Sequence, residues 1–237
     1  MKVFMADQEQ PDKQLKSQAK FACNKMSKSV ARAEARRKAG EGDASSGLYT
    51  PGGERKYINR AERRRVLAVM HRLERERALF SLVLAWSGGR VSEVLALRPN
   101  SFQLERNVVA LQTLKRRQPH VREIPIAPGL MAALERQFRL KKLQSNPDTA
   151  NQRLWPWSRV TAWRFVKGAM LEAGIVGRPA CPRGLRHGFG VGTLQAMVPL
   201  NLVQRWMGHA RISTTAIYAD ASGEEEAAFA ARFWDGL

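Results

Sequence analysis

The sequence predicts a mainly α-helical domain with one small antiparallel β-sheet. Apolar residues recur at helical spacing from about residue 57, and the period changes to short β-type runs between residues 107 and 126. The helical pattern then returns. Hydrophobic residues make up 44% of the 237 residues, which is enough for a packed core and argues against global disorder.

Local signals mark the ends of several predicted helices. Asn59 and Ser158 are suitable N-caps, Ser213 is expected to cap a short helix, and the pair Gly88-Gly89 stops a strongly apolar helix. The predicted helices cover residues 60–73, 76–89, 90–98, 129–143, 158–174, 183–197, 199–208 and 213–220.

The predicted sheet lies between the third and fourth of these helices. The runs "NVVALQTL" (107–114) and "VREIPI" (121–126) have β-type composition, and the basic stretch "KRRQPH" separates them. This arrangement predicts a β-hairpin or a small sheet with a positively charged connection.

The two ends of the chain differ in composition from the middle. Residues 1–56 form a basic N-terminal arm and linker, which is either a solvated flexible segment or an arm that lies along DNA phosphates. Residues 57–220 are expected to be the globular domain. Residues 221–237 form a helix-prone tail whose apolar face, which carries Phe229, Phe233 and Trp234, packs on its own domain or on a neighbouring subunit.

The charge of the chain indicates its class of partner. The formal net charge is +19 and the pI is about 11.0, so a polyanion is the expected partner and an acidic membrane surface is the alternative. No apolar run reaches the length of a transmembrane helix, and the N-terminus lacks an apolar signal core. Cys23 and Cys181 belong to no CxxC motif, which predicts a reduced, cytoplasmic protein.

The motifs for nucleotide, metal or serine chemistry are missing. There is no GxxxxGK[ST], HExxH or GxSxG, and the four histidines (His71, His120, His187 and His209) lack ligand spacing, so no cofactor and no metal are expected. The remaining Arg, Lys, His and Tyr side chains suit attack on a phosphodiester. Arginine neutralises phosphate oxygens, a tyrosine phenol is a nucleophile, and lysine or histidine protonates the leaving oxygen.

Three separated blocks resemble one known family. "SGGRVSEVLALR", "RGLRHGFG" and "RWMGHARISTTAIYAD" occur in the order and approximate spacing found in the tyrosine recombinases, the phage integrase family. The resemblance covers residues 57–220 and implies the tyrosine recombinase catalytic-domain fold. It also implies a compact member, because residues 1–56 are too short and irregular for the family's usual N-terminal DNA-binding domain.

The resemblance implies a set of site residues. Arg90 and Arg186 match the two phosphate-clamping arginines, and Glu93 matches the acidic residue that orients the site. His209 matches the third phosphate-side donor, and Tyr218, nine residues later, matches the nucleophile. Taken singly, Arg90 fits an exposed arginine at a helix start better than a phosphate ligand, and Tyr218 fits a packed aromatic better than a nucleophile; the agreement of Arg90, Arg186 and His209 favours the functional interpretation.

Further basic residues are implied in the hairpin. Lys115 falls where the family places the general acid that protonates the 5′ oxygen, and its neighbours Arg116 and Arg117 are expected to contact DNA. Any of the three is equally suited to an electrostatic contact with a phosphate at the hairpin tip.

One position departs from the family pattern. Arg183 stands where the family usually has His, three residues before Arg186. Arginine does not act as a base, because it keeps its proton in proteins. It is still able to donate hydrogen bonds to a phosphate oxygen, and Glu93 is a candidate partner for it. His187 is expected to pack.

The resemblance implies a site-specific recombinase that cuts and rejoins double-stranded DNA through a 3′-phosphotyrosyl intermediate. It also implies self-association, as a tetramer on paired sites, and accessory proteins, with the chain bound to nucleoid or plasmid DNA in the cytoplasm. One alternative is a weakly active or inactive DNA-binding protein on the same fold that acts in replication or transcription control. Another is a type IB topoisomerase with the same chemistry on one duplex.

Overall fold

The computed structural model describes residues 47–114, 120–220, 226–227, 230–231 and 234. The chain divides at residue 46 into two units, and the unit Gly47–Leu237 contains all of the described residues. Residues 1–46 of the predicted N-terminal arm, the hairpin residues 115–119 and most of the predicted tail lie outside the described residues. Residues 47–56 of the predicted arm are described, and Leu48 among them is buried. The domain boundaries after residues 56 and 220 therefore stay predictions.

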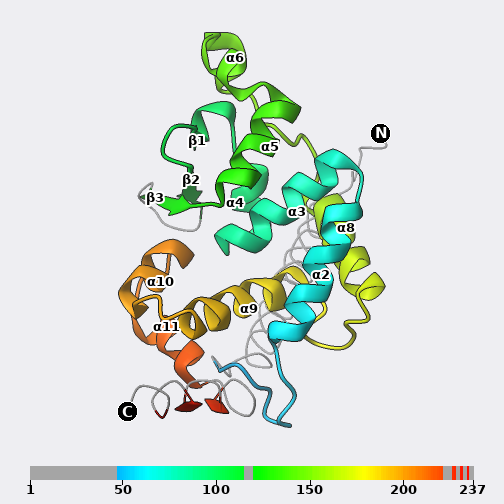
Figure 1. Ribbon diagram of the computed structural model, residues 1–237, viewed down its shortest axis with the longest axis vertical. Coiled ribbons are helices and arrows are strands. Elements are labelled where there is room, and N and C mark those ends of the chain that lie inside the picture. Colours follow the sequence, from blue (N-terminus) through cyan, green and yellow to red (C-terminus); the bar gives the residue numbers. More distant parts are fainter. Residues whose placement is uncertain (1–46, 115–119, 221–225, 228–229, 232–233, 235–237) are drawn as a thin grey trace, which may run out of the picture. The chain divides into compact units, whose positions relative to one another are not determined.

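The described unit is mainly helical, as predicted (Figure 1). Its helices are α2 (Arg60–Arg72), α3 (Arg75–Ser87), α4 (Val91–Leu95), α5 (Pro128–Phe138), α6 (Leu140–Gln144), α7 (Pro147–Ala150), α8 (Arg159–Glu172), α9 (Pro182–Gln195), α10 (Leu200–Met207) and α11 (Ser213–Ala216). Two 3₁₀ turns, η1 (Pro99–Ser101) and η2 (Ile217–Asp220), complete the order.

The sheet has three antiparallel strands in the order β1-β2-β3. The strands are β1 (Phe102–Gln103), β2 (Val108–Thr113) and β3 (His120–Pro125). The register pairs Val109 with Phe102 on one side and with Ile124 on the other. Strands β2 and β3 confirm the predicted runs. Strand β1 was not predicted, because two residues are too few to show an alternating pattern.

Two of the three predicted caps are confirmed. The Asn59 side chain accepts from the Glu62 amide at 2.8 Å, and Glu62 accepts from the Asn59 amide at 2.8 Å, which forms a capping box. Ser158 accepts from the amide of Thr161 at 3.1 Å. The third prediction was wrong: Ser213 is the first residue of α11, and the N-cap is Ile212, which makes no side-chain capping bond.

The predicted helix over 129–143 is divided into two. Arg139 adopts a left-handed conformation with φ of 53°, so α5 ends before it and α6 starts after it. Both Leu134 in α5 and Leu140 in α6 are fully buried. The break changes the direction of the chain while both apolar side chains stay in the core, a tertiary requirement that helical periodicity does not reveal.

The core consists of two clusters of buried side chains. The larger one is built from α2, α3, α8 and the sheet, and it includes Phe80, Leu111 and Trp155. The smaller one lies around α9, α10 and η2 and includes Phe189 and Tyr218. The predicted nucleophile is therefore part of the smaller cluster, and the side chains around it determine its position.

Candidate active site

The turn from α3 into α4 positions the first predicted arginine. Gly88 ends α3 in a left-handed conformation, and Arg90 is the extended residue that precedes α4. Glu93 lies one turn later. Its Oε2 accepts from the Arg90 amide at 2.9 Å, and its Oε1 accepts from Arg90 Nη1 at 2.8 Å. Arg90 and Glu93 thus form an ion pair because they lie three residues apart, at the two ends of the sequence "RVSE".

A second arginine, from β3, completes the interactions of Glu93. Arg122 Nη2 donates to Glu93 Oε2 at 2.6 Å, and both side chains are at most 1% exposed. Arg122 Nη1 donates to Thr113 Oγ1 at 2.9 Å, and Nε donates to the carbonyl of Trp206 at 2.7 Å. Burial alone raises the pKa of Glu93, but Arg122 and Arg90 outweigh burial and lower it, so the carboxylate stays ionised.

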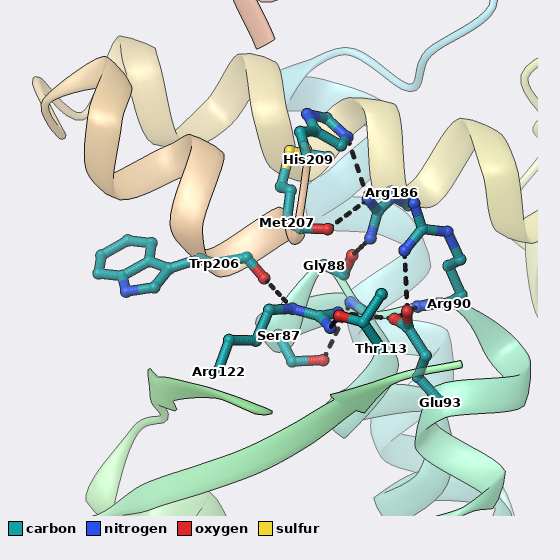
Figure 2. Close-up of polar contacts among 11 residues, drawn as sticks. Ser87, Gly88, Arg90, Glu93, Thr113, Arg122, Arg186, Trp206, Met207 and His209 are labelled. Atoms are coloured by element: carbon teal, nitrogen blue, oxygen red, sulfur yellow. Dashed lines mark hydrogen bonds and ion pairs between the residues drawn. The ribbon is translucent and has the colours of Figure 1, made fainter. Parts of the chain in front are cut away.

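The Arg186 guanidinium from α9 bonds to two backbone carbonyls (Figure 2). It donates to the carbonyl of Gly88 and, at 2.6 Å, to the carbonyl of Met207. Figure 2 shows Arg186 between these carbonyls, His209 and the Arg90–Glu93 pair. Burial and, next, the charge of Arg90 lower the pKa of Arg186 to about 10, which still leaves it protonated near neutral pH.

The hydrogen bonds of His209 define its tautomer. Arg186 Nη2 lies 3.1 Å from His209 Nε2, and because arginine only donates, Nε2 accepts. The proton of the neutral ring is then on Nδ1, which donates to Thr215 Oγ1 at 2.9 Å. Burial and then the charges of Arg186 and Arg90 lower the pKa of His209 to about 3. The ring is therefore neutral at physiological pH.

Tyr218 lies in η2 with 1% of its surface exposed. Its hydroxyl is 3.2 Å from His187 Nδ1, and its ring stacks near His209 with centroids 6.1 Å apart. A Cβ atom at Gly190 would lie 2.7 Å from the tyrosine ring, so the missing side chain lets Tyr218 approach α9. Burial raises the pKa of Tyr218 to about 12 against the lowering effect of Arg186 and Arg90.

The cluster as a whole carries a positive charge. Arg90, Arg122 and Arg186 supply three guanidinium groups, Glu93 supplies one carboxylate, and His209 is neutral. Such an excess of fixed donors favours an anion, and arginine forks match the oxygens of phosphates and carboxylates.

The structure brings five of the predicted site residues together. Arg90, Glu93, Arg186, His209 and Tyr218 form the connected arrangement described above. Arg183 lies exposed on α9. Glu93, the candidate partner of Arg183, binds Arg90 and Arg122. Lys115, Arg116 and Arg117 lie outside the described residues.

Sequence reasoning missed Arg122, Thr113 and Thr215 as members of the site. A usable signal existed for Arg122: residues 122, 124 and 126 share one face of the strand run, and the other two are buried isoleucines. A charge on that apolar face requires a buried partner. His187, expected only to pack, contacts the hydroxyl of Tyr218.

Neither a metal cluster nor a membrane segment is found where the structure is defined. Among residues 47–114 and 120–220 and the described positions of the tail, no three His, Cys, Asp or Glu side chains gather closely enough to hold a metal ion. Within the same residues, no helix is both long and apolar enough to cross a membrane.

Solved structures with the same fold define the class to which this domain belongs. XerH recombinase bound to its palindromic difH substrate, in a post-cleavage complex, matches with a TM-score of 0.60 at 21% identity, covering 76% of this chain and 53% of that one. The catalytic domain of bacteriophage HP1 integrase matches with a TM-score of 0.53 at 20% identity, covering 74% of this chain and 94% of that one. The fold is that of a tyrosine recombinase catalytic domain.

Sequence comparison identifies the family. The model of the phage integrase family matches residues 56–225, and the chain belongs to that family. Tyrosine recombinase XerC of Roseiflexus castenholzii is 35% identical over 158 residues, which cover 63% of this chain and 48% of the relative. Tyrosine recombinase XerA of Thermococcus onnurineus is 30% identical over 186 residues, which cover 77% and 64%. The chain thus spans between about half and two thirds of these relatives' length.

Proposed function

We propose that the protein is a site-specific DNA recombinase that cuts and rejoins DNA strands through a covalent 3′-phosphotyrosyl intermediate. One observation carries the proposal: Tyr218 lies within a buried group that also contains Arg186 and His209, and this group has a surplus of positive charge. A tyrosine beside fixed cations is what attack on a phosphodiester requires.

Each residue has a role in the proposed reaction. Arg90 and Arg186 bind the non-bridging oxygens of the scissile phosphate. His209 is the third donor to that phosphate. Tyr218 attacks the phosphorus, the 5′ oxygen leaves with a proton from Lys115, and a 5′ hydroxyl of the partner duplex later reverses the reaction. Because phosphodiester bonds are exchanged one for one, the reaction needs no external energy source.

The observed geometry implies two adjustments when a phosphate binds. His209 Nε2 accepts a hydrogen bond from Arg186, so it becomes a donor only after it takes up a proton, which an adjacent anion favours. Tyr218 is buried, so its hydroxyl has to become accessible to the phosphorus. The short segment Ser213–Asp220 is the part of the chain whose shift would achieve this.

Double-stranded DNA is the proposed partner, and self-association on paired sites is proposed with it. The net charge of +19 supports a polyanionic partner. The XerH structure with the same fold contains its DNA substrate, which supports the same choice. Arg116 and Arg117 are proposed DNA contacts, and Arg183, exposed on α9, is proposed as a further donor to phosphate.

The decisive experiment traps the covalent intermediate. Randomised duplexes that bind the full-length protein are enriched, and a nicked substrate that cannot be rejoined is prepared from the selected sequence. We expect a protein–DNA adduct with the wild-type chain and none with Tyr218→Phe, although both bind the duplex. A wild-type protein that binds the selected duplex without forming any adduct would contradict the proposed function.

The N-terminal arm is proposed to add phosphate contacts. Removal of residues 1–46, which leaves the buried Leu48 in the cluster that contains Tyr218, should weaken binding to the selected duplex and reduce the slope of log affinity against log salt concentration. Adduct formation by the bound, truncated protein should persist. An unchanged salt slope after truncation would exclude contacts between the arm and phosphates.

A further inference from the structure

The Tyr218 hydroxyl has a nitrogen partner that the sequence motifs did not assign to chemistry. His187 projects from α9 and its Nδ1 lies 3.2 Å from Tyr218 Oη. The two rings are tilted by 53° with centroids 5.8 Å apart, so the contact is made between their polar atoms and not by stacking. Gly190, one turn further along α9, provides the space for the tyrosine ring to come this close.

Attack by Tyr218 requires that its hydroxyl lose a proton. Burial raises the pKa of this phenol to about 12, so very little phenolate exists near neutral pH. A base within hydrogen-bond distance of the hydroxyl removes this difficulty, because the proton leaves as the new bond forms. The contact between His187 and Tyr218 has the distance that such a transfer needs.

The other groups near the tyrosine are poorly suited to this task. Both nitrogens of His209 are occupied, one by Arg186 and the other by Thr215. Both oxygens of Glu93 bind guanidinium groups. Arg183, at the position of the family's usual histidine, does not release its proton near neutral pH.

We propose that His187 is the general base of strand cleavage and takes the proton of Tyr218 at Nδ1. This inference rests on the proposed function and adds a catalytic residue to it. The proton moves from Tyr218 Oη to His187 Nδ1 while the Oη–phosphorus bond forms and the bond from phosphorus to the 5′ oxygen breaks. In the reverse step the protonated His187 returns the proton to Oη as an incoming 5′ hydroxyl displaces the tyrosine, and the proton of that hydroxyl goes to the neutral amine of Lys115.

Two substitutions separate proton transfer from support of the tyrosine ring. His187→Asn keeps a polar atom near the position of Nδ1, but an amide is not basic enough to take the proton of Tyr218. His187→Ala leaves a space that free imidazole is able to enter. With the nicked substrate described above, we expect both variants to bind DNA and to form adduct about 100- to 10,000-fold more slowly than the wild type. Added imidazole should restore a substantial part of the rate of His187→Ala.

The controls use the same substrate. His71→Ala removes an exposed histidine, and its rate should match the wild type with and without imidazole. If His187→Ala fails to fold, His187→Asn is compared with and without 3-fluorotyrosine in place of tyrosine, because a more acidic phenol should reduce the penalty of losing the base.

Specific results would overturn the inference. A His187→Asn variant with the wild-type rate would do so. The same conclusion follows if imidazole does not raise the rate of adduct formation by His187→Ala, or if 3-fluorotyrosine does not raise the rate of His187→Asn relative to the wild type. In either case His187 would only hold the Tyr218 ring in position. In each of these cases the wild-type adduct still forms and the proposed function stands. A wild-type chain without an adduct overturns the proposed function, and this inference with it.

Discussion

The two sides of the candidate site are held by different kinds of interaction. On the side of α4 and the sheet, Glu93 and Arg122 are joined at 2.6 Å, and further charged hydrogen bonds of 2.7–2.9 Å surround them. On the side of α11 and η2, Tyr218 is held by packing against α9 and by one hydrogen bond of 3.2 Å to His187. Charge-assisted bonds between buried groups are shorter and stronger than neutral ones.

This difference suits two different tasks. Residues that bind a phosphate work best when they are already in place, because no reorganisation is then needed during the reaction. The proposed nucleophile, in contrast, is buried, so the segment that carries it has to shift until the hydroxyl is accessible to a phosphate while it stays within reach of His187 Nδ1. A strongly fixed anion site beside a weakly fixed tyrosine is therefore the arrangement that the proposed reaction requires. Four substitutions or conditions test this comparison.

The largest effect is expected on the strongly fixed side. Arg122→Met removes the buried arginine partner of Glu93, leaves only the partly exposed Arg90 to pair with the carboxylate, and should reduce the free energy of unfolding by about 3–5 kcal/mol. Urea unfolding measures the change. Arg106→Met is the control, because Arg106 pairs with Glu123 at an exposed site, and it should cost less than about 1 kcal/mol. Similar losses from both substitutions would contradict a special role for the buried pair.

A smaller effect is expected where Tyr218 packs on α9. Gly190→Ala places a methyl group 2.7 Å from the tyrosine ring, and relief of this contact should cost about 1–3 kcal/mol in urea unfolding. Gly192→Ala, in the same helix, has no atom within 4 Å of the new Cβ and should instead gain up to about 1 kcal/mol from helix propensity. If both variants are stabilised, Tyr218 is not closely packed against α9.

The pH dependence of stability tests the neutral state of His209. Its pKa is lowered to about 3 in the folded protein, so the unfolded state binds a proton first, and stability should decline as the pH falls from about 6.5 toward about 3. The slope contributed by one group is at most about 1.4 kcal/mol per pH unit. His209→Gln should remove this contribution between about pH 6.5 and about pH 5, where carboxylates titrate little. An identical slope in the variant would disprove the assignment.

The smallest effect is expected at the hydrogen bond that holds the His209 ring. Thr215→Val removes the oxygen that accepts from Nδ1 and should lower the free energy of unfolding by about 1 kcal/mol. Thr214→Val is the matched control, because Thr214 lies exposed in the same short helix and should change stability by a few tenths of a kcal/mol. Equal changes in the free energy of unfolding of the two variants would show that the bond from Thr215 to His209 does not stabilise the protein.

Local sequence signals predicted some of the features that neighbouring residues determine. The N-cap at Asn59 was predicted, and its bond spans three residues. The Arg90–Glu93 pair also spans three residues but was not predicted, because Arg183 was the candidate partner of Glu93. The bond from Arg122 to the carbonyl of Trp206 joins residues 84 apart in sequence, and no local pattern encodes it. The left-handed Arg139 and the uncapped start of α11 at Ser213 likewise follow from tertiary packing, which overrides local preference.

The two carbonyls that bind Arg186 have a consequence for the charge of the site. The carbonyl of Gly88 ends α3 and that of Met207 ends α10, and each carries the partial negative charge of a helix C-terminus. A buried guanidinium usually bonds to a carboxylate, but the bonds given for Arg186 go to these two carbonyls and to His209, and the Glu93 carboxylate stabilises its charge without a direct bond among them. Because dipoles stabilise the cation without cancelling its formal charge, Arg186 keeps a full unit of charge for an incoming anion.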